Sequence, residues 1–338
     1  MDLHVFWFVT LGVLLAGYVV LDGFDLGVGT LHLFVRDDLE RRLVLNSIGP
    51  LWDGNEVWLV TFGGALFAAF PDVYATAFTT FYLPFMLLLV FLIGRAVSIE
   101  FRSKFQAHWW RSYWDFSFAA ASTLVLLVAG VAVGNSIQGL PLGPNKEFAG
   151  TLVDLFRPYP LLVGVFCVVS AAMHGALFLA LKTEGELERR VRRWAWRAYG
   201  AFLFMYGVVS LYTLLTIPHA TRNFGQYPAA WIIVALNVLA VANIPRCLHK
   251  GRTDWAFISS AATLAALVFL FGMALFPNLI VSRPDPASSL TIYNASSSLE
   301  TLRIMRTIVF MGMPFVLAYT SAVYWVFRGK TRIDKFSY

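Results

Sequence analysis

Charged residues are scarce in this chain: they make up 14% of its 338 residues, whereas hydrophobic residues make up 58%. Soluble domains usually carry about 25% charged residues, so the composition argues strongly against a soluble enzyme. Intrinsic disorder is excluded because disordered segments have low hydrophobicity. The apolar runs are continuous, whereas strands of a membrane β-barrel alternate apolar and polar residues over about ten positions. The sequence therefore predicts an all-α integral membrane protein.

Recognisable catalytic and metal-binding motifs are also missing. The two cysteines, Cys167 and Cys247, form no CxxC pair, no zinc spacing and no haem-attachment motif, and we interpret them as packing residues. There is no P-loop, GxGxxG or HExxH motif and no Ser/His/Asp set. The net charge of +6 does not indicate nucleic-acid binding, because the basic residues lie between apolar runs. The chain by itself shows no catalytic centre and no metal site.

Nine apolar runs are each long enough to cross a bilayer, which takes about 20 residues of helix. With boundaries uncertain by several residues, they are 5–34, 51–70, 77–94, 116–134, 160–181, 196–215, 229–244, 256–276 and 306–327. Of the 26 lysines and arginines, 20 fall in the gaps after runs one, three, five and seven and in the C-terminal tail, and 6 fall on the other side. The positive-inside rule then predicts an external N-terminus and a cytoplasmic C-terminus.

Four acidic residues lie within the apolar runs: Asp22 and Asp25 in the first, and Asp53 and Glu56 at the start of the second. An ionisable group in hydrocarbon costs at least a few kcal/mol and usually pairs, lines water or carries protons. Members of each pair are three residues apart and so share a helix face. If both helices run straight to a turn near Glu40, Asp25 lies level with Asp53, and Asp22 with Glu56. Because Gly49 and Pro50 argue for a break before the second helix, this register depends on that turn.

Other residues near these acids allow structural or functional interpretations. Arg95 ends the third run and either snorkels to the interface or pairs with Asp53 or Asp25. The GxxxG formed by Gly23 and Gly27 predicts close helix packing, and we extend the same expectation to Gly63 and Gly64.

Histidine bears on haem binding, because a b-type haem is often held by two axial ligands on facing helices. His174 is the one histidine deep in a predicted helix. We expect a hydrogen-bonded core residue there, with haem ligation as the less favoured alternative.

Several segments carry a specific resemblance. GYVVLDGFDLGVG spans 17–29, NSIGPLWDGNEVW spans 46–58 and GGALFAAFP spans 63–71, followed by Arg95 and by EFRSK at 100–104. Together they resemble subunit II of cytochrome bd-type quinol oxidases. The motifs concentrate in residues 1–105, and the remainder is similar in length, helix count and orientation.

The resemblance implies a subunit of a bacterial or archaeal plasma-membrane complex that oxidises quinol and reduces oxygen to water, building a proton motive force without a true pump. Subunit I, the partner, would carry haem b, haem d and the quinol site. This chain would form a single polytopic domain over 1–338. It would consist of two four-helix bundles, about 1–134 and 160–276, and a peripheral ninth helix at 304–328. A structural quinone in this chain, a small accessory subunit and bound lipids are compatible with the family.

The family also implies a role for the intramembrane acids. Matched by motif, Asp22, Asp25 and Asp53, with Trp52 beside them, belong to a proton path from the cytoplasm toward the haems of subunit I. Glu56 lies in the same motif, and we add Arg95 as a supporting residue. Two alternatives remain: a purely structural scaffold for subunit I, and a stand-alone proton-coupled transporter.

Overall fold

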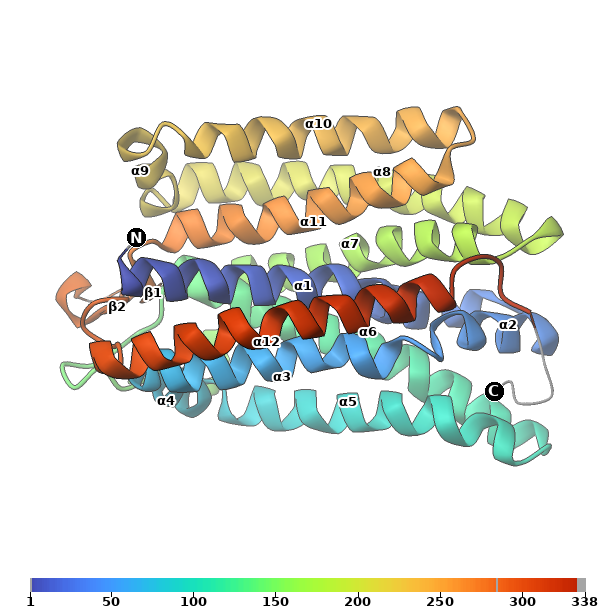
Figure 1. Cartoon of the computed structure of the whole chain (residues 1–338), viewed down its shortest axis with the longest axis horizontal. Coiled ribbons are helices and arrows are strands. Elements are labelled where there is room, and N and C mark those ends of the chain that lie inside the picture. Colours follow the sequence, from blue (N-terminus) through green and yellow to red (C-terminus); the bar gives the residue numbers. More distant parts are fainter. Residues whose placement is uncertain (1, 284, 333–338) are drawn as a thin grey trace.

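The computed structural model describes residues 2–283 and 285–332, so the last residues of the basic tail lie outside the described chain. Long helices dominate it and run side by side (Figure 1). The α-helices are α1 (Leu3–Leu31), α2 (Asp38–Ile48), α3 (Trp52–Ala69), α4 (Pro71–Thr80), α5 (Tyr82–Phe101), α6 (His108–Gln138), α7 (Pro158–Lys182), α8 (Gly185–Thr216), α9 (His219–Gln226), α10 (Ala230–His249), α11 (Thr253–Leu275) and α12 (Leu299–Val326).

Eight of these helices are long and apolar enough to cross a membrane within the described residues: α1, α5, α6, α7, α8, α10, α11 and α12. The all-α membrane class is therefore confirmed. Helix α3 coincides with the remaining apolar run, but its first two turns carry Asp53, Asn55 and Glu56, which lower its hydropathy. These polar residues thus lower the mean hydropathy of α3 below that of the other membrane helices, and the count of nine spans stays a prediction.

The chain breaks where its turn residues predict. Helix α1 ends in a short 3₁₀ turn, and α2 is a separate helix that stops at Gly49, before Pro50. Pro71 occupies the first position of α4, where its missing N–H costs nothing. The first and second apolar runs are thus not one straight hairpin, because α2 intervenes between them.

The two ends of the molecule differ in structure. The N-terminus, α4, α9 and a two-stranded antiparallel sheet of β1 (Asn278–Ile280) and β2 (Leu290–Thr291) lie at one end, and α2 lies at the other (Figure 1). We call the latter the α2 end. The sheet falls in one of the two longest polar gaps of the sequence, where apolar patterning gave no prediction of strands.

Helix α1 packs against α7 through glycines that allow the backbones to touch. A Cβ on Gly27 would lie 1.8 Å from the carbonyl oxygen of Ala171, and one on Gly175 would lie 2.5 Å from the Gly27 backbone. The packing expectation is wrong for the other three glycines. A Cβ on Gly23, Gly63 or Gly64 would meet no atom within 4 Å, so none of these three positions is a point of close helix contact.

Helix α12 lies against α1 and α3 with little of its surface buried, and Leu302 is its one buried residue in the described chain. The Trp7 indole N–H donates to the Leu302 carbonyl oxygen at 3.0 Å, near the start of α12. Beyond its other end, the Lys330 ammonium donates to the Thr183 carbonyl oxygen at 2.6 Å. Helix α12 is therefore fixed to the other helices near its two ends.

Candidate functional site

Asp22 and Arg95 form a fully buried ion pair between α1 and α5. Their side chains are both 0% exposed. Arg95 Nη2 donates to Asp22 Oδ1 at 2.6 Å, and Nη1 donates to Oδ2 at 3.0 Å. This two-bond arrangement matches the fork of the guanidinium to the carboxylate and gives both charge compensation and fixed orientation.

Glu56 and Trp52 complete the surroundings of Arg95 from α3. Glu56 Oε2 lies 3.9 Å from Arg95 Nη1, and the Glu56 side chain is 21% exposed. The Arg95 guanidinium also lies over the Trp52 ring, 6.0 Å from its centre. Asp22 and Glu56 therefore share one arginine, which agrees with the predicted level of this pair.

Asp25 is equally buried but has a different set of partners. Asn55 Nδ2 donates to Asp25 Oδ2 at 2.7 Å, and the Tyr324 hydroxyl donates to Asn55 Oδ1 at 2.8 Å. Asp25 Oδ1 has no hydrogen-bond partner among the described residues. The second carboxyl on α1 is thus held by an amide and reached indirectly from α12.

Asp53 does not face Asp25, although straight helices would have placed the two acids level with each other. Asp53 is exposed on the first turn of α3, and Asn55, two residues on, faces Asp25 instead. Successive helical residues are rotated by about 100°, so Asp53 and Asn55, which are two residues apart, lie on nearly opposite faces of α3. The break at Gly49 and Pro50 sets where α3 begins and therefore which of its residues meets α1.

Both expectations for Arg95 are also corrected. Arg95 does not snorkel, because it is fully buried, and its partner is Asp22 rather than Asp53 or Asp25. Of the four predicted acids, the structure brings Asp22 and Glu56 to Arg95, places Asp25 beside them on α1, and leaves Asp53 on the surface.

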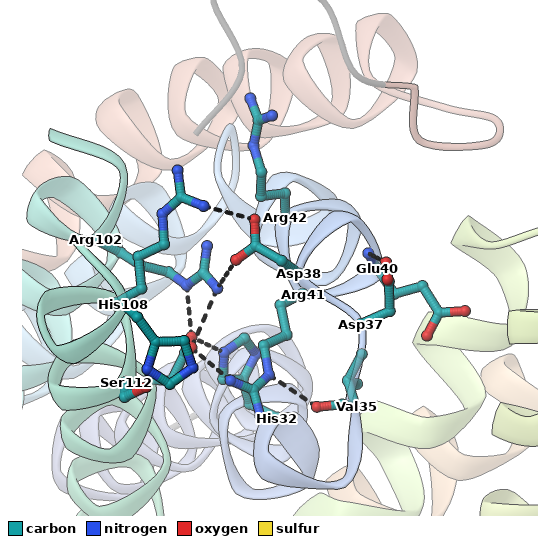
Figure 2. Close-up of polar contacts among 12 residues, drawn as sticks. His32, Val35, Asp37, Asp38, Glu40, Arg41, Arg42, Arg102, His108 and Ser112 are labelled. Atoms are coloured by element: carbon teal, nitrogen blue, oxygen red, sulfur yellow. Dashed lines mark hydrogen bonds and ion pairs between the residues drawn. The ribbon is translucent and has the colours of Figure 1, made fainter. Parts of the chain in front are cut away.

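A second polar cluster, at the α2 end, was missed by the sequence argument (Figure 2). Asp115 of α6 accepts from His32 Nε2 and Arg102 Nε, each at 2.5 Å, and from Arg41 Nη1 at 2.8 Å. Arg102 also donates to Asp38 at 2.8 Å. These contacts tie α2 to the ends of α1, α5 and α6.

The signal for this cluster was present but weak. Asp115 precedes an apolar run by one residue, so it reads as a loop acid, whereas α6 begins seven residues earlier and buries it. His32 likewise reads as interfacial but is fully buried. The arginines in the gaps that flank the first, third and fourth apolar runs, close to Asp115 or to His32 in sequence, were the available clue.

His174 has both ring nitrogens engaged, as expected of a hydrogen-bonded core residue. Its Nε2 donates to the Val20 carbonyl oxygen at 3.0 Å, and its Nδ1 lies 2.6 Å from the Ser260 hydroxyl. The ring stacks on Phe257 with 4.7 Å between centres. Neither ring nitrogen of His174 is therefore free to bind a haem iron.

Chemically, the site consists of acid groups within an apolar interior, one cation and an amide. In residues 2–283 and 285–332, no group of three or more His, Cys, Asp or Glu side chains could hold a metal ion. Nucleophile and base pairs of the kind used in covalent catalysis are not part of this arrangement. What the residues can do is hold protons, exchange them through hydrogen bonds and stabilise helix contacts.

Comparisons with known proteins agree on one family. The family model of cytochrome bd terminal oxidase subunit II matches residues 3–327. The cytochrome bd-I ubiquinol oxidase subunit 2 of Escherichia coli K12 is 37% identical, over 97% of this chain and 95% of that protein. The cytochrome bd ubiquinol oxidase subunit 2 of Bacillus subtilis 168 is 36% identical, over 97% and 96%.

A solved structure shares the fold. A chain of the bd oxidase from Geobacillus thermodenitrificans superposes with a TM-score of 0.81 and 18% identity, covering 97% of this chain and 99% of that one. At this identity the likeness concerns the fold alone. It spans both halves of the molecule, including the helices that carry the buried acids and those of the C-terminal half.

Proposed function

This chain belongs to the cytochrome bd terminal oxidase subunit II family, and from that premise we propose that its intramembrane acids deliver protons to a neighbouring haem subunit. Membership makes it part of a respiratory quinol oxidase complex, an oxidoreductase of the inner membrane, with subunit I as its partner. The haems of such a complex lie mainly in subunit I. The proposed role of this chain is to support subunit I and to supply part of a cytoplasmic proton path.

The two buried histidines of the described chain, His32 and His174, do not offer Nε2 to a haem iron. Nε2, the nitrogen that would bind iron, donates to a backbone carbonyl in His174 and meets Asp115 in His32. We therefore assign haem b and haem d to subunit I and no catalytic centre to this chain. A structurally bound quinone, a small accessory subunit and specific lipids are compatible with this proposal.

The observation that carries the proposal is the grouping of Asp22, Asp25 and Glu56 around one arginine inside apolar helices. Burial of this much ionisable chemistry is expensive, and intramembrane acids commonly mark proton routes. Asp53, exposed one turn from the buried group, would receive protons from water or pass them to subunit I. Trp52 covers Arg95 and would limit access from that side.

Charge and packing support a specific orientation. By the positive-inside rule, the 20-to-6 division of lysines and arginines favours an α2 end in the cytoplasm and an external N-terminus. With α3 counted as a span, nine helices cross the membrane. We group α1, α3, α5 and α6 (about 1–134) and α7, α8, α10 and α11 (160–276) as two four-helix bundles, with α12 (304–328) at the periphery of one polytopic domain.

This arrangement would store energy without a pump. Reduction of oxygen to water consumes protons, and oxidation of quinol releases them. If the consumed protons enter only from the cytoplasm while quinol releases its own outside, charge separates across the membrane. The role of Asp22, Asp25, Asp53 and Glu56 is then to make the inner source available to subunit I.

The test is quinol-driven oxygen consumption by the assembled complex carrying Asp25→Asn or Asp53→Asn, with haem content read from the optical spectrum. We expect both variants to lower turnover while the haem spectrum stays intact. Asp254→Asn, at an exposed position on α11, is the matched control and should have no effect. Normal turnover in both site variants would contradict the proposal, and loss of haem would assign the acids to assembly.

A scaffold role is the second candidate, and the Asp22–Arg95 pair is the observation that favours it. Both oxygens of Asp22 are committed to the arginine, so this acid joins α1 to α5 whether or not protons pass. The scaffold alternative predicts that variants of Asp22 and Arg95 reduce the amount of assembled complex without changing turnover per haem.

A further inference from the structure

Asp22 and Asp25 lie on one face of α1 but are not equivalent. Both Nη groups of Arg95 donate to Asp22. Among the described residues, Asp25 accepts one side-chain hydrogen bond, from the Asn55 amide. Arg95 Nε also has no partner among the described residues. Of the two acids, Asp25 is therefore the one with an oxygen free to take up a proton or a hydrogen bond.

The orientation of Asn55 is fixed by its neighbours. Its Nδ2 also approaches the Leu21 carbonyl oxygen, at 3.3 Å, and a carbonyl can only accept. The amide nitrogen must therefore face Leu21 and Asp25, and its Oδ1 must face Tyr324, whose hydroxyl donates to it at 2.8 Å. Tyr324 thus donates a hydrogen bond to Asn55, and Asn55 donates one to Asp25.

This file of hydrogen bonds crosses three helices. Asp25 belongs to α1, Asn55 to α3 and Tyr324 to α12. Asn55 is 2% exposed, so a misplaced amide would have no water with which to replace its partners. Helix α12 buries little else, which makes the Tyr324 contact a substantial part of its attachment at the α2 end.

We propose that Asn55 and Tyr324 are positioning residues of the proton path: they hold the Asp25 carboxyl with one oxygen open, and they make α12 a working part of that path. The inference rests on the proposed function. Asn55 aims the carboxyl, and Tyr324 prevents the Asn55 amide from rotating. Neither residue needs to carry a proton itself.

The experiment uses the assembled oxidase in lipid nanodiscs and two measurements: redox-induced infrared difference spectra and turnover per haem. Asp25→Asn identifies the carboxyl band of Asp25 by its loss. Tyr324→Phe removes one oxygen atom, and Asn55→Leu removes both hydrogen bonds. Tyr319→Phe is the matched control, because it makes the same change on the same helix at a side chain that is 71% exposed.

We expect Tyr324→Phe and Asn55→Leu to shift the Asp25 band and to lower turnover about fivefold, the scale of one hydrogen bond. Tyr319→Phe should leave the band and the turnover unchanged.

If Asp25→Asn slows turnover while Tyr324→Phe changes neither measurement, this inference is wrong and the proton path stands. If Asp25→Asn itself has no effect on turnover, the proposed function fails. A band shift of equal size in Tyr319→Phe would also overturn the inference, and Tyr324→Phe keeps the test valid if Asn55→Leu does not assemble.

Discussion

The buried Asp22–Arg95 pair predicts a large and strongly coupled effect on stability. Arg95→Gln leaves the carboxylate of Asp22 buried without a cation, and it also removes the positive charge 3.9 Å from Glu56. Breaking a buried pair from one side costs about 3–5 kcal/mol, because the remaining charge stays desolvated. Asp22→Asn should cost a similar amount, because the buried Arg95 guanidinium then lacks the carboxylate that accepts its two hydrogen bonds. The double variant removes both charges of the Asp22–Arg95 pair, so we expect it to recover about 2 kcal/mol or more relative to the sum of the two.

The assay is denaturant titration of the complex in mixed micelles, followed by tryptophan fluorescence, for the wild type, both single variants and the double variant. Arg303→Gln is the control: Arg303 pairs with Glu300 on α12, where both side chains are more than half exposed, and such pairs contribute about 1 kcal/mol or less. Costs of the two single variants that add to within about 0.5 kcal/mol in the double variant would refute the reasoning, since they would show that the two charges do not stabilise each other.

Three further predictions concern packing, the second cluster and pH. Gly27→Ala places a methyl group 1.8 Å from an α7 carbonyl oxygen and should prevent normal folding, whereas Gly63→Ala meets nothing within 4 Å and should leave the fold intact; expression and thermal stability compare the two. Asp115→Leu removes the one carboxylate that Arg102 shares with His32 and should cost about 3–5 kcal/mol in the same titration. The Thr151 backbone N–H holds the pKa of Asp154 at about 2, below its usual 3.8. The loop contact it makes should therefore persist above about pH 4 and be lost as pH falls through about 2, which pepsin cleavage of the loop would report.

Much of the fold could be predicted, because membrane helices are long apolar runs that are recognisable from composition alone. The apolar runs fall on helices, although the run at 77–94 crosses from α4 into α5, and the GP pair at 49–50 marks a real break. Helix ends were less accessible: α6 and α8 extend well beyond their apolar runs, because polar residues continue a helix once it leaves hydrocarbon. The residues that form the small sheet lie in a polar gap, where hydropathy carries no information about backbone pairing.

The candidate site was predicted by residue type but not by contact. Position inside apolar runs identified Asp22, Asp25 and Glu56 correctly as buried or half-buried groups near one another. Which acid would meet Arg95 could not be predicted, because it depends on how α3 and α5 are rotated relative to α1. Rotating α3 about its axis by about 100° would bring a neighbouring residue, in place of the present one, to the face that meets α1. No local sequence pattern fixes this angle.

Contacts far apart in sequence were the least predictable. Tyr324 meets Asn55 across 269 positions of the chain, and His32 meets Asp115 across 83. Each residue by itself fits an ordinary interpretation as an interfacial aromatic or a loop charge. These residues acquire significance from the packing of whole helices, which decides which polar groups share an interior.

The proposed function requires that acids of α1 and α3 carry protons from the cytoplasmic side to subunit I. The most direct measurement is time-resolved proton uptake from the cytoplasmic face of reconstituted oxidase during its reaction with oxygen, comparing Asp25→Asn with the wild type and with Asp254→Asn. We expect uptake at least about tenfold slower in Asp25→Asn with haem content preserved, and unchanged uptake in Asp254→Asn. Uptake at the wild-type rate in a fully assembled Asp25→Asn complex would contradict the proposed proton path.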